Sequence, residues 1–104
     1  MTALVHICIV RADLPRGVLA AQLIHAAGES ARGAVPAGTR AVALAARDDA
    51  QLEALARRLA FEGVDHLLIR EPDPPWCGAA MALGLPPRPR DPPLQALRRL
   101  PLLR

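Results

Sequence analysis

Two polar side chains, Gln22 and His25, interrupt the apolar stretch "GVLAAQLIHAA" at residues 17–27. A side-chain amide can orient a neighbouring group by hydrogen bonding, and a histidine can accept or donate a proton near neutral pH. At 100° per residue, Val18, Gln22 and His25 share one stripe of a predicted helix. Two interpretations stay open: the stripe is the solvated face of an ordinary helix, or it lines a site.

A second set of candidate residues follows the predicted strands. Arg11 and Asp13 come after the first apolar strand, and Glu71 and Asp73 come after the third. Because ligands usually bind beyond the carboxyl ends of parallel strands, we expect these groups to converge near the start of the first helix. A carboxylate there can act as a general base, and an arginine can stabilise an oxyanion. The simpler alternative is that Arg11 and Asp13 satisfy each other or loop amides, while Glu71 and Asp73 are solvated.

The sequence lacks several familiar signatures of catalysis and cofactor binding. It contains no GxxxxGK[ST] or GxGxxG motif, and its single serine, Ser30, does not lie in a nucleophile elbow. The three histidines are not spaced with Cys8 and Cys77 as metal ligands are. We therefore expect no cofactor and no metal. Both cysteines fall in apolar runs, which predicts buried thiols and a reduced, cytoplasmic setting.

Basic residues are concentrated at the C-terminal end of the 104-residue chain, whose net charge is +3. Residues 85–104 contain five arginines and one acid, whereas residues 1–84 contain eight arginines and nine acids. Such a basic tail is typical of a protein with an anionic partner such as nucleic acid, although a solvated terminus has the same composition. The chain shows neither a secretory signal nor an apolar run of membrane-spanning length, so no membrane association is expected.

Hydrophobic periodicity predicts alternating strands and helices. The expected strands cover residues 3–10, 40–46, 64–70 and 77–83, and the expected helices cover 16–32, a segment between Asp48 or Asp49 and Gly63, and about 92–100. The link between the third and fourth strands is too short for a parallel crossover, so these strands should pair antiparallel. The order β-α-β-α-β-β-α predicts one α/β domain over residues 1–104, a three-layer α/β/α sandwich with a mixed four-stranded sheet.

The first loop and helix resemble those of a known family. "VRADL" (10–14) followed by "AAQLIHAA" (20–27) is similar to the start of type II peptidyl-tRNA hydrolases, which carry an Arg-x-Asp-Leu loop and a helix with Ala-Ala-Gln-x-x-His-Ala. The pattern from Pro15 to Ala27 and "DHLL" (65–68) resemble the branch called peptidyl-tRNA hydrolase domain-containing proteins. The resemblance covers about residues 4–104. It implies hydrolysis of the ester between peptide and tRNA during translation, with tRNA or peptidyl-tRNA as partner, and it leaves a homodimer open.

The resemblance, the chemistry that ester hydrolysis requires and the basic tail together suggest roles for individual residues. The catalytic candidates are His25, Glu71 and Asp13. The substrate-binding candidates are Arg11, Arg16, Gln22, Asp73, Arg98 and Arg99. In this scheme a carboxylate or the histidine activates water, and Arg11 or Arg16 supplies the positive charge near the oxyanion.

Three departures from the family bear on activity. The family's Gly-Lys pair is Gly17-Val18 here, and the chain contains no lysine. The family's aspartate after the third strand is Glu71, and its threonine-containing loop is replaced by "PDPPWCGAA". Three hypotheses follow: an esterase acting on peptidyl-tRNA, a non-catalytic module that binds tRNA, another nucleic acid or a protein, and a different hydrolase on the same scaffold.

Overall fold

The sheet is built around strand β1 (Leu4–Arg11), and the computed structural model describes residues 3–104. β1 pairs in parallel with β2 (Arg40–Ala46) and antiparallel with β4 (Ala79–Gly84). β4 in turn pairs antiparallel with β3 (Leu67–Glu71), which gives the order β2-β1-β4-β3. Because β1 and β3 both run antiparallel to β4, they run parallel to each other and end at the same edge of the sheet.

The apolar run of β1 forms a strand whose two faces are both covered. Ile9 and Val10 are successive residues, so their side chains point to opposite faces, and both are fully buried. Ile9 belongs to an apolar cluster with residues of the second helix, and Val10 belongs to a cluster with residues of the first helix. The strand predicted over residues 3–10 is therefore present as β1, and it is buried on both faces.

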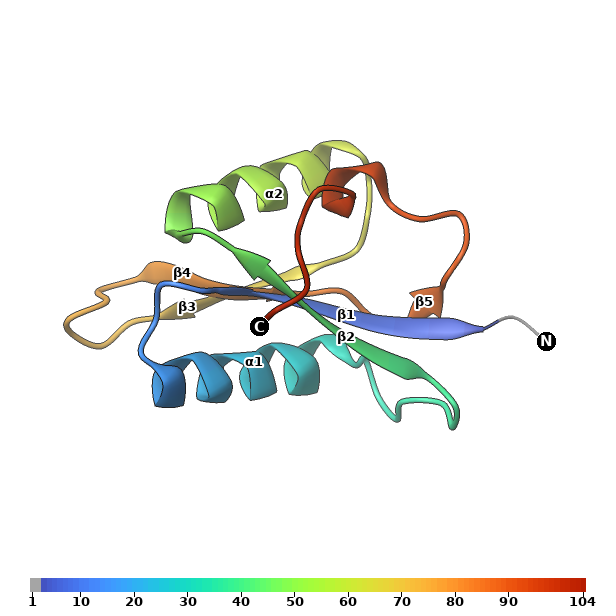
Figure 1. Cartoon of the computed structure of the whole chain (residues 1–104), viewed down its shortest axis with the longest axis horizontal. Coiled ribbons are helices and arrows are strands. Elements are labelled where there is room, and N and C mark those ends of the chain that lie inside the picture. Colours follow the sequence, from blue (N-terminus) through green and yellow to red (C-terminus); the bar gives the residue numbers. More distant parts are fainter. Residues whose placement is uncertain (1–2) are drawn as a thin grey trace.

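Two α-helices, α1 (Arg16–Ser30) and α2 (Asp49–Phe61), lie against opposite faces of the sheet (Figure 1). α2 begins where Asp48 accepts a hydrogen bond from the backbone N–H of Gln51 at 2.9 Å, as an N-terminal capping residue does. The helix buries leucines at i, i+3 and i+7 spacing, which places them on one face. These residues are Leu52, Leu55 and Leu59.

Helix α1 approaches β4 closely at a glycine. A β-carbon at Gly84 would lie 2.5 Å from Oγ of Ser30 and 2.7 Å from the carbonyl oxygen of Ala26. The Ser30 hydroxyl is also hydrogen-bonded to Nε2 of His6 at 2.9 Å, so the buried histidine of β1 has a polar partner on the helix. The absence of a side chain at Gly84 therefore sets the position of α1 over the sheet.

The C-terminal part of the chain differs from the sequence prediction in two respects. The expected four-stranded sheet has a fifth strand, β5 (Arg88–Pro89), which pairs antiparallel with the start of β1. The expected helix over 92–100 is only a 3₁₀ turn, η1 (Gln95–Leu97). Prolines explain the difference: Pro92, Pro93 and Pro101 leave too few residues between them for a stable α-helix.

The last residues of the chain cover the outer edge of β2. The backbone N–H of Ala45 donates to the carbonyl of Pro101 at 2.9 Å, and the N–H of Leu103 donates to the carbonyl of Ala43 at the same distance. These bonds satisfy part of an edge that would otherwise expose unpaired backbone groups.

The two cysteines lie in different environments. Cys8 is buried in β1, as predicted, but Cys77 is exposed, and that prediction is wrong. Cys77 lies in the turn between β3 and β4 with a positive φ of 47°, and the next residue is Gly78 with a φ of 91°. The apolar run that suggested a buried strand at this point begins only at Ala79.

Candidate functional site

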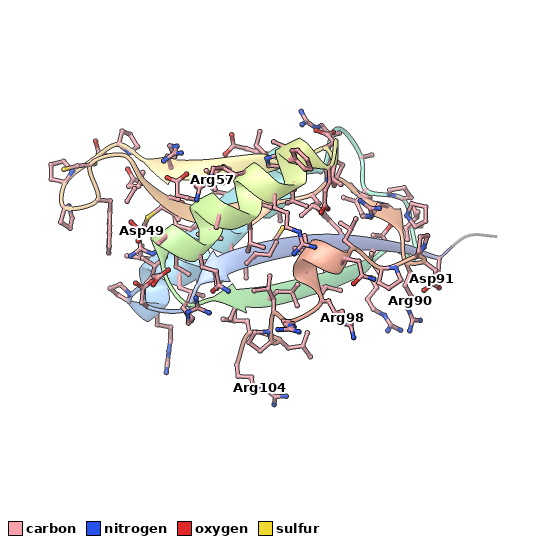
Figure 2. All side chains as sticks on the ribbon, turned by 90° about the horizontal axis from the view of Figure 1, so that it is seen from above. Asp49, Arg57, Arg90, Asp91, Arg98 and Arg104 are labelled. Atoms are coloured by element: carbon pink, nitrogen blue, oxygen red, sulfur yellow. The ribbon has the colours of Figure 1, made fainter. Side chains whose placement is uncertain are left out.

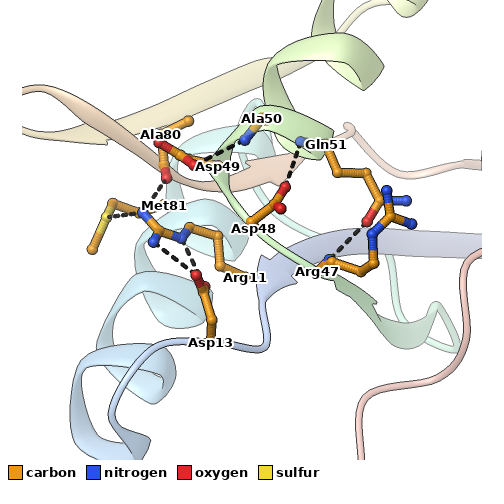
Figure 3. Close-up of polar contacts among 9 residues, drawn as sticks. All are labelled: Arg11, Asp13, Arg47, Asp48, Asp49, Ala50, Gln51, Ala80 and Met81. Atoms are coloured by element: carbon orange, nitrogen blue, oxygen red, sulfur yellow. Dashed lines mark hydrogen bonds and ion pairs between the residues drawn. The ribbon is translucent and has the colours of Figure 1, made fainter.

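Arg11 and Asp13, at the end of β1, form a bidentate ion pair. Nε of Arg11 donates to one oxygen of Asp13 at 2.9 Å, and Nη2 donates to the other at 3.0 Å (Figure 3). Nη1 donates to the carbonyl oxygen of Ala80 at 3.2 Å, and the guanidinium lies 5.5 Å from the centre of the Trp76 ring. Arg11 is only 8 % exposed, so these contacts hold its charge in one place.

The ion pair changes the chemistry that Asp13 can perform. The hydrogen bond from the Arg11 guanidinium holds the pKa of the Asp13 carboxyl below its ordinary value of 3.8. A carboxylate with lowered proton affinity and both oxygens engaged by one arginine is a weak general base. Asp13 therefore anchors Arg11, which is the simpler of the two interpretations that the sequence allowed.

Gln22 and Glu71 meet across the same edge of the sheet. The side-chain amide of Gln22 on α1 donates to Oε2 of Glu71, the last residue of β3, at 3.2 Å. Oε1 of Glu71 accepts from the backbone N–H of Asp73 at 3.2 Å. Gln22 is buried and Glu71 is half-buried, so a carboxylate with access to solvent is held by two donors. The first helix and the end of the third strand meet at this pair, whereas the polar contacts of Arg11 within residues 3–104 are with Asp13, Ala80 and Met81 and not with Glu71.

His25 does not join this pair. Its side chain is 63 % exposed, and Nδ1 lies 3.1 Å from Oε2 of Glu29, one turn further along α1. His25 lies about 60° around the helix from Gln22, and that difference is enough to turn it towards solvent. Val18, the third residue of the predicted stripe, is half-buried and packs against the apolar cluster between α1 and the sheet.

The remaining predicted binding residues are all exposed. Arg16 is exposed at the first residue of α1, and Asp73 is exposed in the β3–β4 turn. Arg98 and Arg99 follow η1 and line a hollow of about 330 Å³ with Arg58 of α2. The basic tail therefore borders α2, whereas Gln22 belongs to α1 on the other face of the sheet.

The first turn of α1 adds backbone donors near Arg11 and Asp13. The residue before the helix is Pro15, which provides no side-chain cap, and the first turn carries no acidic residue. The first amides of a helix have no acceptor within it, so residues 16–18 can donate to an anion. Gly17 is exposed, and a β-carbon there would have no neighbour within 4 Å.

Trp76 is the residue of this region that sequence reasoning missed. It lies in the β3–β4 turn, where its backbone N–H donates to the carbonyl of Asp73 at 3.0 Å and its ring faces Arg11. Trp76 is the only tryptophan of the chain and lies five residues after Glu71, and this closeness in the sequence was the signal that could have placed it near the site. We refer to Arg11, Asp13, Gln22, Glu71 and Trp76 as the carboxyl-end cluster.

Within residues 3–104, no group of three or more His, Cys, Asp or Glu side chains is arranged to hold a metal ion. In the same part of the chain, no helix is long and apolar enough to cross a membrane. No protein-family model matches the chain, and a comparison with curated proteins finds no match. The carboxyl-end cluster is therefore described by its own chemistry: one part-buried ion pair, in which Arg11 is buried and Asp13 is exposed, and one solvent-accessible carboxylate held by an amide.

Proposed function

We propose that this chain is a type II peptidyl-tRNA hydrolase-like protein that hydrolyses the ester between a peptide and tRNA. The observation that supports it is the Gln22–Glu71 hydrogen bond of 3.2 Å, which joins the helix of the "AAQLIHAA" motif to the acid after the third strand. The motif and the acid are 49 residues apart in the sequence, and the acid stands where the family that the chain resembles has an aspartate.

In the proposed reaction, Glu71 orients a water molecule and accepts its proton as the oxygen attacks the ester carbonyl. The negative charge that forms on the carbonyl oxygen is stabilised by the amides at the start of α1, with Arg16 beside them. Collapse of the tetrahedral intermediate expels the ribose oxygen of tRNA, which takes the proton back from Glu71. Gln22 positions the carboxylate, and Asp13 holds Arg11 against the β3–β4 turn.

The proposal includes finer features that the element order, the cysteines and the resemblance predict. These are the three-layer α/β/α arrangement, a cytoplasmic location and tRNA as the anionic partner. In this scheme Arg98 and Arg99 contact the tRNA backbone away from the ester, because they lie beside α2 and not in the carboxyl-end cluster.

The test is release of the blocked amino acid from N-acetyl-phenylalanyl-tRNA by the full chain. Turnover above the buffer rate is expected, with a fall of about 100-fold or more for Glu71→Gln, since general-base catalysis contributes roughly 10²–10⁴-fold. Glu62→Gln removes one exposed carboxylate at the end of α2 and is the matched control. Absence of turnover in the unmodified chain, or an equal loss in both variants, would refute the proposed reaction.

A non-catalytic module that binds tRNA is the second candidate. It is favoured because Arg11 is already engaged by other groups of the protein. The one arginine of the carboxyl-end cluster is fixed by Asp13 and Ala80, and valine replaces the lysine of the family at position 18. This candidate predicts tRNA binding without turnover. Neutralising Arg98 and Arg99 should then reduce the slope of log affinity against log salt by about 0.9 for each lost phosphate contact.

The control for this measurement is Arg57→Gln, which removes an arginine from α2 instead of from the tail. An unchanged salt slope in the Arg98→Gln, Arg99→Gln double variant would exclude the tail from tRNA binding. Binding that does not depend on salt would exclude the second candidate itself.

A further inference from the structure

A pocket of about 370 Å³ opens where β1 begins, about 20 Å along the strand from Arg11. It lies on the face of the sheet that carries α2, beyond the end of the helix, and the segment from β5 to η1 forms its outer wall. The floor consists of aliphatic side chains from β1, β2 and the C-terminal segment. These include Val5, Ile7, Val42, Leu44, Leu94 and Leu97.

Two arginines stand in one row of the sheet at this pocket. Val5 of β1 is paired with Arg40 of β2 on one side and with Arg88 of β5 on the other. Paired residues of neighbouring strands point to the same face, so both arginines project over the face that contains Val5. Neighbouring strands lie about 4.8 Å apart, which places the two arginine backbones about 10 Å from each other. Both guanidinium groups can reach one anion between them.

Arg90 and Arg98, which are labelled in Figure 2, line the pocket from the C-terminal segment. Within residues 3–104, none of the four arginines that line the pocket forms an ion pair with a carboxylate. Asp91, the one acid of the tail, does not line the pocket. Four positive charges around an apolar floor repel one another, and a bound anion would relieve that repulsion.

We propose that this pocket binds a small organic anion that has a carboxylate or phosphate head and an aliphatic body. The guanidinium groups pair with the head, because their planar forks match both oxyanions. The leucine, isoleucine and valine side chains cover the body, and the volume is that of a small-molecule site. A single-stranded nucleic acid fits less well, because bases are held by stacking on aromatic rings, and neither Phe61 nor Trp76 lines the pocket.

The experiment is a titration of the ¹⁵N-labelled full chain with octanoate, octyl phosphate and octanol at constant ionic strength, followed by NMR. Octanoate and octyl phosphate should shift the amide signals of Val5, Val42 and Leu97, whereas octanol should bind at least tenfold more weakly. Affinity should rise by about fourfold for each methylene added from hexanoate to octanoate, since each buried methylene adds a similar increment of binding free energy. Whether octanoate or octyl phosphate binds more tightly identifies the preferred head group.

The matched variants are Arg40→Gln and Arg57→Gln. Arg40 is exposed at the start of β2, so its loss should leave the fold intact and weaken octanoate binding by about tenfold. Arg57 lies on α2 outside the pocket and should have no effect (Figure 2). Equal binding of octanol and octanoate, equal effects of the two variants, or no shifts at millimolar octanoate would overturn the proposal. Displacement of octanoate by a short single-stranded RNA would instead assign the pocket to nucleic acid.

Discussion

Replacing Gly84 by alanine should destabilise the fold, because α1 leaves no room for a β-carbon at this point of β4. The new carbon would lie 2.5 Å from Oγ of Ser30 and 2.7 Å from the backbone oxygen of Ala26. The serine is buried against His6, and the oxygen belongs to the helix backbone, so relief requires α1 to move. Overpacking costs about 1–3 kcal/mol, and we expect the upper end, about 3 kcal/mol. With an unfolding entropy of about 2.1 cal/mol/K per residue, Tm should fall by about 14 °C.

The assay is urea unfolding followed by far-UV circular dichroism, with Gly28→Ala as the control on the same helix. A β-carbon at Gly28 would have no neighbour within 4 Å, so this change should stabilise the fold by about 0.5–1 kcal/mol through helix propensity. The two glycine-to-alanine changes are therefore expected to have opposite signs. A free energy of unfolding for Gly84→Ala within about 0.5 kcal/mol of the unmodified chain would refute the close packing of α1 on β4.

Three further predictions follow from the ionisable groups. Burial lowers the pKa of His6 below its ordinary 6.5, so the unfolded chain binds a proton more readily than the folded chain. The free energy of unfolding should therefore fall as the pH drops below about 6.5. In urea titrations, His6→Gln should remove this pH dependence. The hydrogen bond from Arg11 lowers the pKa of Asp13, so the contribution of the pair is present above about pH 4 and lost below it; Asp13→Asn should flatten acid unfolding in that range. Ellman's reagent should modify Cys77 in the folded chain and Cys8 only after unfolding, because Cys8 is buried and burial raises the pKa of its thiol. Two reactive thiols in the folded chain would contradict this prediction.

The strands and helices that the sequence predicts with strong periodicity are present in the structure. The apolar run of β1 and the leucine spacing of α2 are local signals, and β2 has the predicted bounds, residues 40–46. The C-terminal segment could not be predicted in this way. Leu94, Ala96 and Leu97 have a helix-like spacing, but the neighbouring prolines allow only a 3₁₀ turn. β5 pairs with β1 because the chain after β4 comes back to the start of β1, and the local sequence pattern does not predict this long-range contact.

The strand topology predicts the position of some residues of the carboxyl-end cluster but not of others. The parallel course of β1 and β3 was enough to expect Glu71 near α1, and Gln22 meets it. Whether Gln22 or His25 turned inwards depended on a rotation of about 60° around the helix, which the close approach at Gly84 helps to set. The contact of Trp76 with Arg11 arises from the tight turn after β3, and no periodicity predicts it.

The most direct measurement is the rate at which the full chain releases N-acetyl-phenylalanine from its tRNA ester, with Glu71→Gln and Glu62→Gln assayed at the same concentration. The proposed function predicts turnover by the unmodified chain and by Glu62→Gln, and a loss of about 100-fold or more in Glu71→Gln. Retention of full activity by Glu71→Gln would contradict the assignment of the carboxylate beside Gln22 as the base. A chain that binds tRNA without releasing the amino acid would contradict the hydrolase and favour the binding module.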